Sequence, residues 1–197
     1  YLVWFGGIGT YIKGSHETNI GVGDRANDAH RVNGRDLRAR VVGEGANLGA
    51  TQAGRVEYAS RGGRINTDFI DNSAGVDCSD NEVNIKIALN AEMAAGHLAF
   101  DARNRLLGRM TDDVAALVLE DNRLQTLALS LAERGRAAAL PAYQRVIQML
   151  EAQGRLNRAV ESLPDDEQIS QRLRDGQGLE RPELAVLLSY TKLALQD

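Results

Sequence analysis

Two short segments place an asparagine among small residues directly after a predicted β-strand. Residues 41–47 end at Asn47, and residues 72–79 run from Asn72 to Ser79. Small residues let a flat ligand approach the backbone closely, and an asparagine amide can both donate to and accept from a carboxamide or a ribose hydroxyl. Asparagine and glycine are also the common residues of turns. The spacing alone therefore leaves two interpretations open, a ligand-binding edge and ordinary turn chemistry.

Other patterns that carry chemistry are weak in this sequence. Residues 21–26 match the dinucleotide fingerprint G-x-G-x-x-A, but no apolar strand precedes them, so we interpret the match as accidental. His16, His30 and His97 lack the spacing of a metal site, and Cys78 has no cysteine partner. We therefore predict no metal site, and we interpret Cys78 as a bystander thiol.

Three predicted strands and one helix must position the asparagine segments. Most of the 20 glycines precede residue 78, where short β-rich runs alternate with glycine turns. The predicted strands cover residues 1–5, 39–42 and 65–70, and the helix covers residues 51–61. This order is typical of a parallel sheet with crossover helices, which binds ligands at the carboxyl ends of its strands. We predict an α/β fold with a partial Rossmann-like parallel sheet over residues 1–78.

An all-α helical domain is predicted over residues 79–197, which are rich in Ala, Leu, Arg and Glu. Ser79 and Glu82 form the S-x-x-E pattern of a capping box, which predicts that a long helix begins at Ser79. Apolar residues then recur every three or four positions, and we expect this helix to end at Gly108. More helices follow, and Pro182 suits the first turn of the last one.

Composition and charge exclude several classes of protein. The formal net charge is −4, which does not favour a nucleic-acid-binding surface. No apolar run approaches the roughly 18 residues of a membrane span, so we predict no membrane partner. The single cysteine fits a reducing, cytoplasmic setting. Because the sequence starts at Tyr1 inside a predicted strand and stops inside a helical pattern, we expect it to be part of a longer protein.

The asparagine segments resemble the second half of the nucleotide-binding domain of glutamate dehydrogenases. That family carries E-G-A-N after one strand and N-A-G-G-V-x-x-S about 25 residues later, and here Ala74 replaces one glycine of the second motif. The wider sequence is similar to the large bacterial NAD-specific glutamate dehydrogenases. Seven of their motifs occur in order: W-F-G-G-I-G-T at 4–10, D-R-A-N-D at 24–28, V-V-G-E-G-A-N-L-G at 41–49, G-R-I-N-T-D at 63–68, D-N-S-A-G-V at 71–76, E-V-N-I-K-I at 82–87 and R-P-E-L-A-V-L-L at 181–188.

The resemblance implies reversible oxidative deamination of L-glutamate to 2-oxoglutarate and ammonia, with NAD as the cofactor. It implies cofactor contacts at Gly6, Gly7, Asn47 and Asn72. It implies substrate contacts at Val76 and Ser79, with Ser79 near the side-chain carboxylate of the substrate. It also implies a homo-oligomer. The family's catalytic lysines and aspartate, and its glycine-rich loop, match nothing in these residues, so we expect the chain alone to be inactive.

Two other functions stay open on the sequence. The first is another amino-acid dehydrogenase, acting on branched-chain or aromatic substrates, although polar Ser79 does not suit an apolar substrate. The second is a non-catalytic helical interaction module with a vestigial nucleotide fold. This alternative predicts that Asn47 and Asn72 can be replaced without loss of activity.

Overall fold

The computed structural model describes residues 1–196 and is a mixed α/β structure in which helices predominate. Its contacts define two compact units. The first joins Tyr1–Asp71 to the residues from Leu127 onward, and the second is Asn72–Thr126. The division at residue 78 that the sequence suggests remains a prediction.

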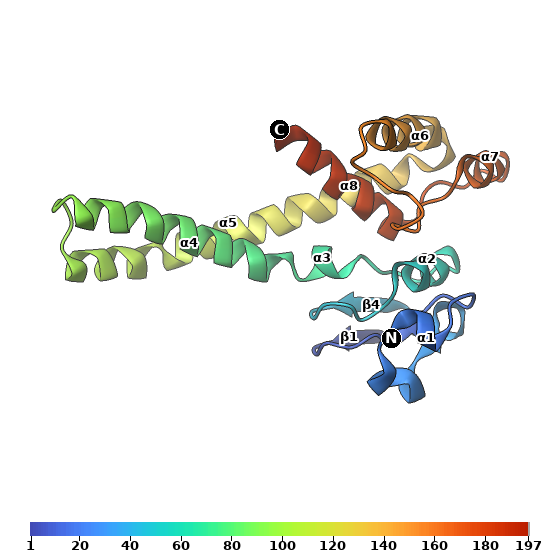
Figure 1. Ribbon diagram of the computed structural model, residues 1–197, viewed down its shortest axis with the longest axis horizontal. Helices are drawn as coiled ribbons and strands as arrows, with labels where there is room; N and C mark the ends of the chain where they lie inside the picture. The colour runs from blue at the N-terminus through green and yellow to red at the C-terminus, as the bar shows by residue number, and fades with distance from the viewer. Residues whose placement is uncertain (197) are drawn as a thin grey trace. The chain divides into compact units, whose positions relative to one another are not determined.

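The first unit contains two small parallel sheets. β1 (Leu2–Phe5) lies beside β4 (Val41–Glu44) in parallel, with Leu2 opposite Val41 and Phe5 opposite Glu44 (Figure 1). β2 (Ile12–Lys13) pairs in the same sense with β3 (Val32–Asn33). Two β-strands that the sequence predicts, 1–5 and 39–42, are therefore confirmed to within about two residues at each end.

The third predicted strand, over residues 65–70, is wrong. Only Arg64 forms a bridge, to Val41, and the short helix α3 (Asp68–Asp71) follows. The backbone amides of Ile70 and Asp71 donate to the carbonyl of Thr67, and the Asp68 carboxylate accepts from the amide of Phe69. Such local bonds compete with a strand ladder, and here they close a helical turn instead.

Helix α2 (Gln52–Ser60) covers one face of the sheet, as the sequence predicts. Thr51 is its N-cap and accepts from the amide of Gly54. The buried residues of α2 are Gly54, Arg55 and Tyr58, and Ala59 packs against the same core while partly buried. The core under the helix consists of Ile12, Val42, Ala50, Tyr58 and Ile65. The chain between β2 and β4 forms the short helix α1 (Asn19–Val22) and two 3₁₀ turns, η1 (Arg25–His30) and η2 (Gly34–Asp36).

The second unit is a helical hairpin of α4 (Ser73–Ala94) and the first part of α5 (Phe100–Arg134). Two expectations are wrong here. Asn72, not Ser79, is the N-cap residue of α4, and Ser79 lies inside the helix. The chain turns at Gly96, which has φ of +80°, whereas Gly108 lies within α5. Left-handed backbone is where glycine is favoured, and a glycine inside a helix costs only about 1 kcal/mol.

The remaining helices of the first unit form its larger core. They are α6 (Arg136–Ala152), α7 (Asp166–Arg174) and α8 (Arg181–Gln196). Leu140, Ile147 and Leu150 of α6 pack with Ile169 of α7 and Leu184 of α8 in one cluster. Asp165 and Gln168 form a capping box at α7, and Pro182 lies in the first turn of α8, as predicted. Between α6 and α7, residues 158–162 form turns rather than a helix.

No helix in residues 1–196 combines the length and the apolar character that crossing a membrane requires.

Candidate functional site

The parallel pairing of β1 and β4 brings three of the predicted site residues to one edge of the sheet. Gly6 and Gly7 follow Phe5 at the end of β1, and Asn47 follows the end of β4. The amide of Ala46 donates to the carbonyl of Phe5 over 3.0 Å, which joins the two loops. Gly6, Gly7 and Asn47 are exposed, and a Cβ added at either glycine would meet open space. This edge is therefore open to a ligand.

Trp4 forms a flat apolar wall beside these loops. Its indole lies so close to β4 that a Cβ added at Gly43 would come within 2.5 Å of the ring. A Cβ added at Gly45, the residue after Glu44, would come even closer to the same ring. Glycine at 43 and 45 is required because no side chain fits between the ring and the backbone.

A buried ion network lies directly behind the edge. The Arg55 guanidinium donates to both carboxylate oxygens of Glu44, through Nε at 2.7 Å and Nη2 at 2.8 Å. Nη2 also lies 3.1 Å from Oδ1 of Asp68. Glu44 is fully buried and Arg55 is 5% exposed. This bidentate geometry is the strong form of an arginine–carboxylate pair, and it ties β4 to α2.

The same carboxylates hold the loop that carries Asn47. Oε2 of Glu44 accepts from the amide of Ala50 at 3.2 Å, and Oδ2 of Asp68 accepts from the amide of Leu48 at 2.8 Å. Leu48 has φ of +65°, a left-handed conformation that is unfavourable for a leucine. Strained backbone persists where its surroundings determine it, and here two carboxylates fix the turn that presents Asn47.

Asp71 joins the end of β4 to the turn before α3. Its Oδ2 accepts from the amide of Glu44 at 2.9 Å, and its Oδ1 accepts from the side-chain amide of Asn66 at 2.7 Å. Asp71 is the residue immediately before Asn72 in the sequence. The two E-G-A-N and D-N-S-A-G-V segments are thus linked through a backbone-to-carboxylate bond.

Burial and ion pairing shift the pKa values of this network. Burial raises the pKa of the Glu44 carboxyl, while the hydrogen bond and charge of Arg55 oppose that shift. Burial by itself lowers the pKa of Arg55, but the hydrogen bond and charge of Glu44 outweigh it and raise the pKa overall. Arg55 therefore stays protonated. With Glu44, Asp68 and Asp71 around one guanidinium, the neighbourhood carries more carboxyl groups than cations.

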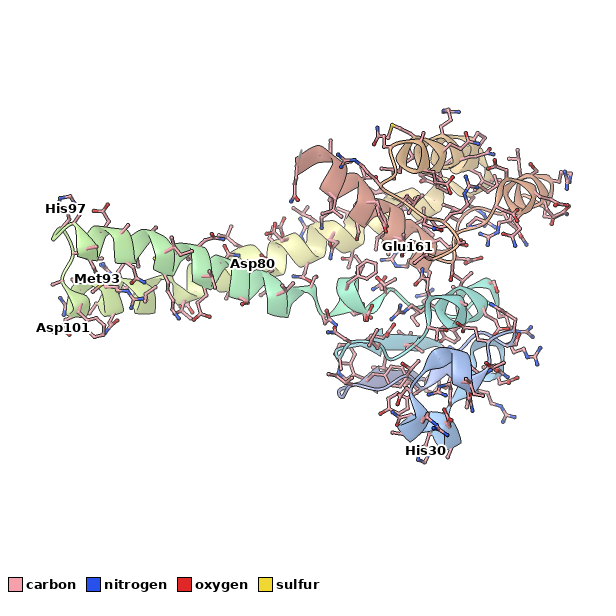
Figure 2. The ribbon with its side chains drawn as sticks, in the orientation of Figure 1. His30, Asp80, Met93, His97, Asp101 and Glu161 are labelled. Carbon is pink, nitrogen blue, oxygen red and sulfur yellow. The ribbon has the colours of Figure 1, made fainter. Side chains whose placement is uncertain are left out.

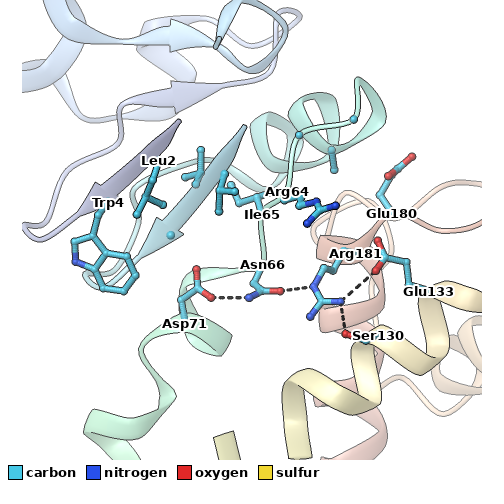
Figure 3. A pocket seen from close by; sticks show the side chains of 16 residues that line it. Leu2, Trp4, Arg64, Ile65, Asn66, Asp71, Ser130, Glu133, Glu180 and Arg181 are labelled. Atoms are coloured by element: carbon cyan, nitrogen blue, oxygen red, sulfur yellow. Dashed lines mark hydrogen bonds and ion pairs between the residues drawn. The ribbon is translucent and has the colours of Figure 1, made fainter. Parts of the chain in front are cut away.

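A pocket of about 730 Å³ opens beside β1 and β4, within the first unit (Figure 3). Leu2 and Trp4 of β1 line one wall, and Asp71 lies beside them. The opposite wall contains Ser130 and Glu133 of α5 and Arg181 of α8. The Trp4 ring therefore faces a space that borders the open edge of β1 and β4.

Of the other three predicted site residues, Asn72 is the N-cap of α4, and Val76 and Ser79 lie on that helix. Asn72, Val76 and Ser79 are spaced by four and three residues, so they share one face of the helix. Val76 and Ser79 are exposed. Next to them, Oγ of Ser73 donates to Asn122 at 2.6 Å and accepts from Gln125 at 3.1 Å, which fixes the start of α4 on α5. The structure thus groups the six predicted residues three by three, one group in each unit.

His97 pairs with a neighbouring carboxylate on the same hairpin. His97 lies at the turn between α4 and α5, where its Nδ1 is 3.0 Å from Oε2 of Glu92 (Figure 2). Across the described residues 1–196, no group of three or more His, Cys, Asp or Glu side chains is arranged to hold a metal ion.

The family model for the catalytic domain of bacterial NAD-glutamate dehydrogenase matches residues 1–132. The chain belongs to this family. An NAD-specific glutamate dehydrogenase of Pseudomonas aeruginosa is 57% identical over 196 residues. Proteins with the same name from Halomonas elongata and Mycobacterium tuberculosis are 54% and 50% identical over 195 and 196 residues. The alignments cover 99–100% of this chain, which spans about 12% of the length of each relative.

Sequence reasoning missed the ion network behind the glutamate dehydrogenase motifs. The signal for it was present, since Glu44 directly follows a buried strand and Arg55 lies on the helix that covers that strand. Charged residues are almost never fully buried unless paired. The motif E-G-A-N was interpreted through its asparagine, whereas its glutamate supports the whole loop.

Proposed function

We propose that this chain forms the nicotinamide end of an NAD-dependent glutamate dehydrogenase. The observation that carries the proposal is the 57% identity, over the whole chain, to an NAD-specific glutamate dehydrogenase. The enzyme would reversibly deaminate L-glutamate to 2-oxoglutarate and ammonia. NAD, when bound, supplies the acceptor for the hydride that leaves the substrate.

The residues at the edge of the sheet suit this cofactor. In the proposal, β1 and β4 belong to a Rossmann-like sheet, Gly6 and Gly7 line the adenosine side, and Asn47 hydrogen-bonds the ribose next to the nicotinamide. Open space at Gly6 and Gly7 and the exposed position of Asn47 support these assignments. The excess of carboxylates around Arg55 also suits the positive charge of an oxidised nicotinamide ring.

The residues on α4 are assigned to the amide of the cofactor and to the substrate. Asn72 would hydrogen-bond the nicotinamide amide, Val76 would pack against the carbon chain of glutamate, and the Ser79 hydroxyl would donate to its side-chain carboxylate. Because α4 begins at Ser73, Ser79 lies in the second turn rather than at the cap. Its hydroxyl, more than the dipole of the helix, must then attract the carboxylate, since the dipole effect is concentrated in the first turn.

Steady-state kinetics of the full-length protein test the proposal. Asn47→Ala and Asn72→Ala should each lower kcat/KM for NAD about tenfold or more, since a lost oriented polar contact costs about 1.5 to 3 kcal/mol. Asn90→Ala, on an exposed position of α4, is the matched control. Unchanged activity in both variants would favour the non-catalytic interaction module and contradict the assignments.

Substrate profiling separates the remaining alternative. The full-length protein should have a higher kcat/KM for glutamate than for leucine, valine and phenylalanine. Ser79→Ala should raise KM for glutamate and so reduce this difference in kcat/KM. The 197-residue chain alone should show no turnover, because it lacks the family's catalytic lysines. A cytoplasmic location and a homo-oligomeric state belong to the same proposal and are open to cell fractionation and light scattering.

A further inference from the structure

Arg181 connects the helical part of the first unit to the sheet. It is the first residue of α8 and lies beyond the 132 residues that match the catalytic-domain model. Its Nη1 donates to Oγ of Ser130 at 3.1 Å and to Oε2 of Glu133 at 3.2 Å, both on α5. Its Nε donates to Oδ1 of Asn66 at 2.5 Å. One guanidinium therefore contacts both the helices and the turn that precedes α3.

The contact with Asn66 continues to the end of β4. Asn66 donates from Nδ2 to Asp71 (Figure 3). Asp71 in turn accepts from the backbone amide of Glu44. Arg181, Asn66, Asp71 and Glu44 thus form an unbroken series of hydrogen bonds. The series ends at the last residue of β4, directly before the loop that presents Asn47.

The chemistry of the partners allows only one orientation of the Asn66 amide. An arginine has only donors and a carboxylate has only acceptors, so the amide oxygen must face Arg181 and the amide nitrogen must face Asp71. A reversed amide would place donor against donor and acceptor against acceptor. The contact with Arg181 consequently fixes the orientation of the Asn66 amide, and that amide fixes the position of the Asp71 carboxylate.

We propose that Arg181 is a positioning residue for the NAD site, acting through Asn66 and Asp71 on the loop that follows β4. The inference rests on the proposed function of that loop. It assigns to α8, a helix outside the matched catalytic domain, a role in holding the cofactor. The competing account is that Arg181 only joins helices to one another, through Ser130 and Glu133.

Two substitutions separate these accounts in the full-length enzyme. Asn66→Asp keeps a partner for Arg181, and even strengthens that contact, but it places a carboxylate against Asp71 and breaks the series there. Ser130→Ala removes a contact on the helical side and leaves the series intact. If Arg181 positions the cofactor loop, Asn66→Asp should raise KM for NAD about fivefold with KM for glutamate changing less than about twofold, and Ser130→Ala should change neither.

Arg181→Gln and the double variant complete a cycle. Residues that act in one series give non-additive effects, so Arg181→Gln should raise KM for NAD to about the same degree as Asn66→Asp, and the double variant should add little more. Arg145→Gln, an exposed arginine of α6, is the matched control. Thermal unfolding and circular dichroism check that each variant folds. If Arg181→Gln does not fold, KM for NAD in Asn66→Asp is the deciding measurement.

The outcomes distinguish this inference from the function on which it rests. An unchanged KM for NAD in Asn66→Asp, or strictly multiplicative effects in the cycle, would overturn the role of Arg181 while Asn47→Ala still reports on the NAD site. If Asn47→Ala leaves KM for NAD unchanged as well, the proposed cofactor site itself is wrong. A loss of kcat that is equal for all variants, with every KM unchanged, would assign Arg181 to stability alone.

Discussion

Arg55 binds Glu44, eleven positions earlier in the chain, with two nearly equal hydrogen bonds that are 2.7 Å and 2.8 Å long. The pair is buried, so each charge depends on the other. Removing one partner of such a pair is far more costly than removing a surface charge, because the remaining charge has lost its solvation and its counterion. The loop that presents Asn47 therefore depends on a residue of the covering helix.

Arg55→Met should destabilise the chain by about 3 to 5 kcal/mol, because it leaves Glu44 and Asp68 without their guanidinium. Urea unfolding followed by circular dichroism measures the change. Arg35→Met is the control, since its side chain is 53% exposed and its contact with Asp36 is 3.8 Å long, and it should cost less than about 0.5 kcal/mol. Equal effects of the two substitutions would show that the network does not stabilise the fold.

Two helical glycines should respond to alanine in opposite directions. In α2, a Cβ at Gly54 would lie 2.8 Å from the carbonyl carbon of Lys13, so Gly54→Ala must move β2 or α2 and should cost about 1 to 3 kcal/mol. In α5, a Cβ at Gly108 would meet open space, so Gly108→Ala should stabilise by about 0.5 to 1 kcal/mol. Thermal unfolding of both variants checks the signs, and a stabilised Gly54→Ala would disprove the close approach.

The acid stability of the chain should depend on Arg158. Hydrogen bonds from Arg158 lower the pKa of Glu151 and of Asp166. The folded state then binds fewer protons than the unfolded state in acid, so this stabilisation is present above the ordinary carboxyl pKa of about 4 and is lost as the pH falls below it. Arg158→Gln should lower the free energy of unfolding at neutral pH. On acidification, the free energy of unfolding of this variant should fall by less than that of the parent chain. Parallel curves of stability against pH for both proteins would contradict this.

Tyr190 should ionise at a higher pH than an ordinary tyrosine. Its hydroxyl donates to Oε1 of Glu161 at 2.7 Å, and this hydrogen bond raises the pKa of Tyr190 to about 12. Subtracting the ultraviolet titration of Tyr190→Phe from that of the parent chain isolates this one tyrosine. Glu161→Gln removes the negative acceptor and should move the isolated midpoint back toward the ordinary tyrosine pKa of about 10. A midpoint that is the same with and without Glu161 would exclude the hydrogen bond as its cause.

Local signals of the sequence predicted the elements whose ends are defined by their own side chains. Thr51 caps α2 at the start of the helix that the sequence predicts, since the cap and the backbone amide that donates to it lie within a few residues. The parallel pairing of the first and second strands agrees with the parallel sheet that the order of predicted elements indicates. Both strands place a predicted site segment at the same edge.

The failures occur where a local signal competes with a longer-range one. Ser79 and Glu82 have the pattern of a capping box, yet the helix begins at Ser73, because adding turns to an existing helix costs less than starting a new one. The apolar residues of 65–70 favoured a strand, whereas Asp68 and Asp71 take part in the network around Arg55 and hold that segment as a turn. Arg181 and Asn66 are 115 residues apart, and no periodicity connects them.

Three consecutive residues at the start of α8 contact three distant segments of the same unit. Arg181 donates to Asn66, the carbonyl of Pro182 accepts from Gln52 at 3.1 Å, and Glu183 pairs with Arg172. A protein shortened at residue 132, where the match to the catalytic domain stops, would lose all three attachments together. A shortened chain that keeps the contacts of the first unit must therefore retain residues 181–183, which lie beyond the limit of the family match.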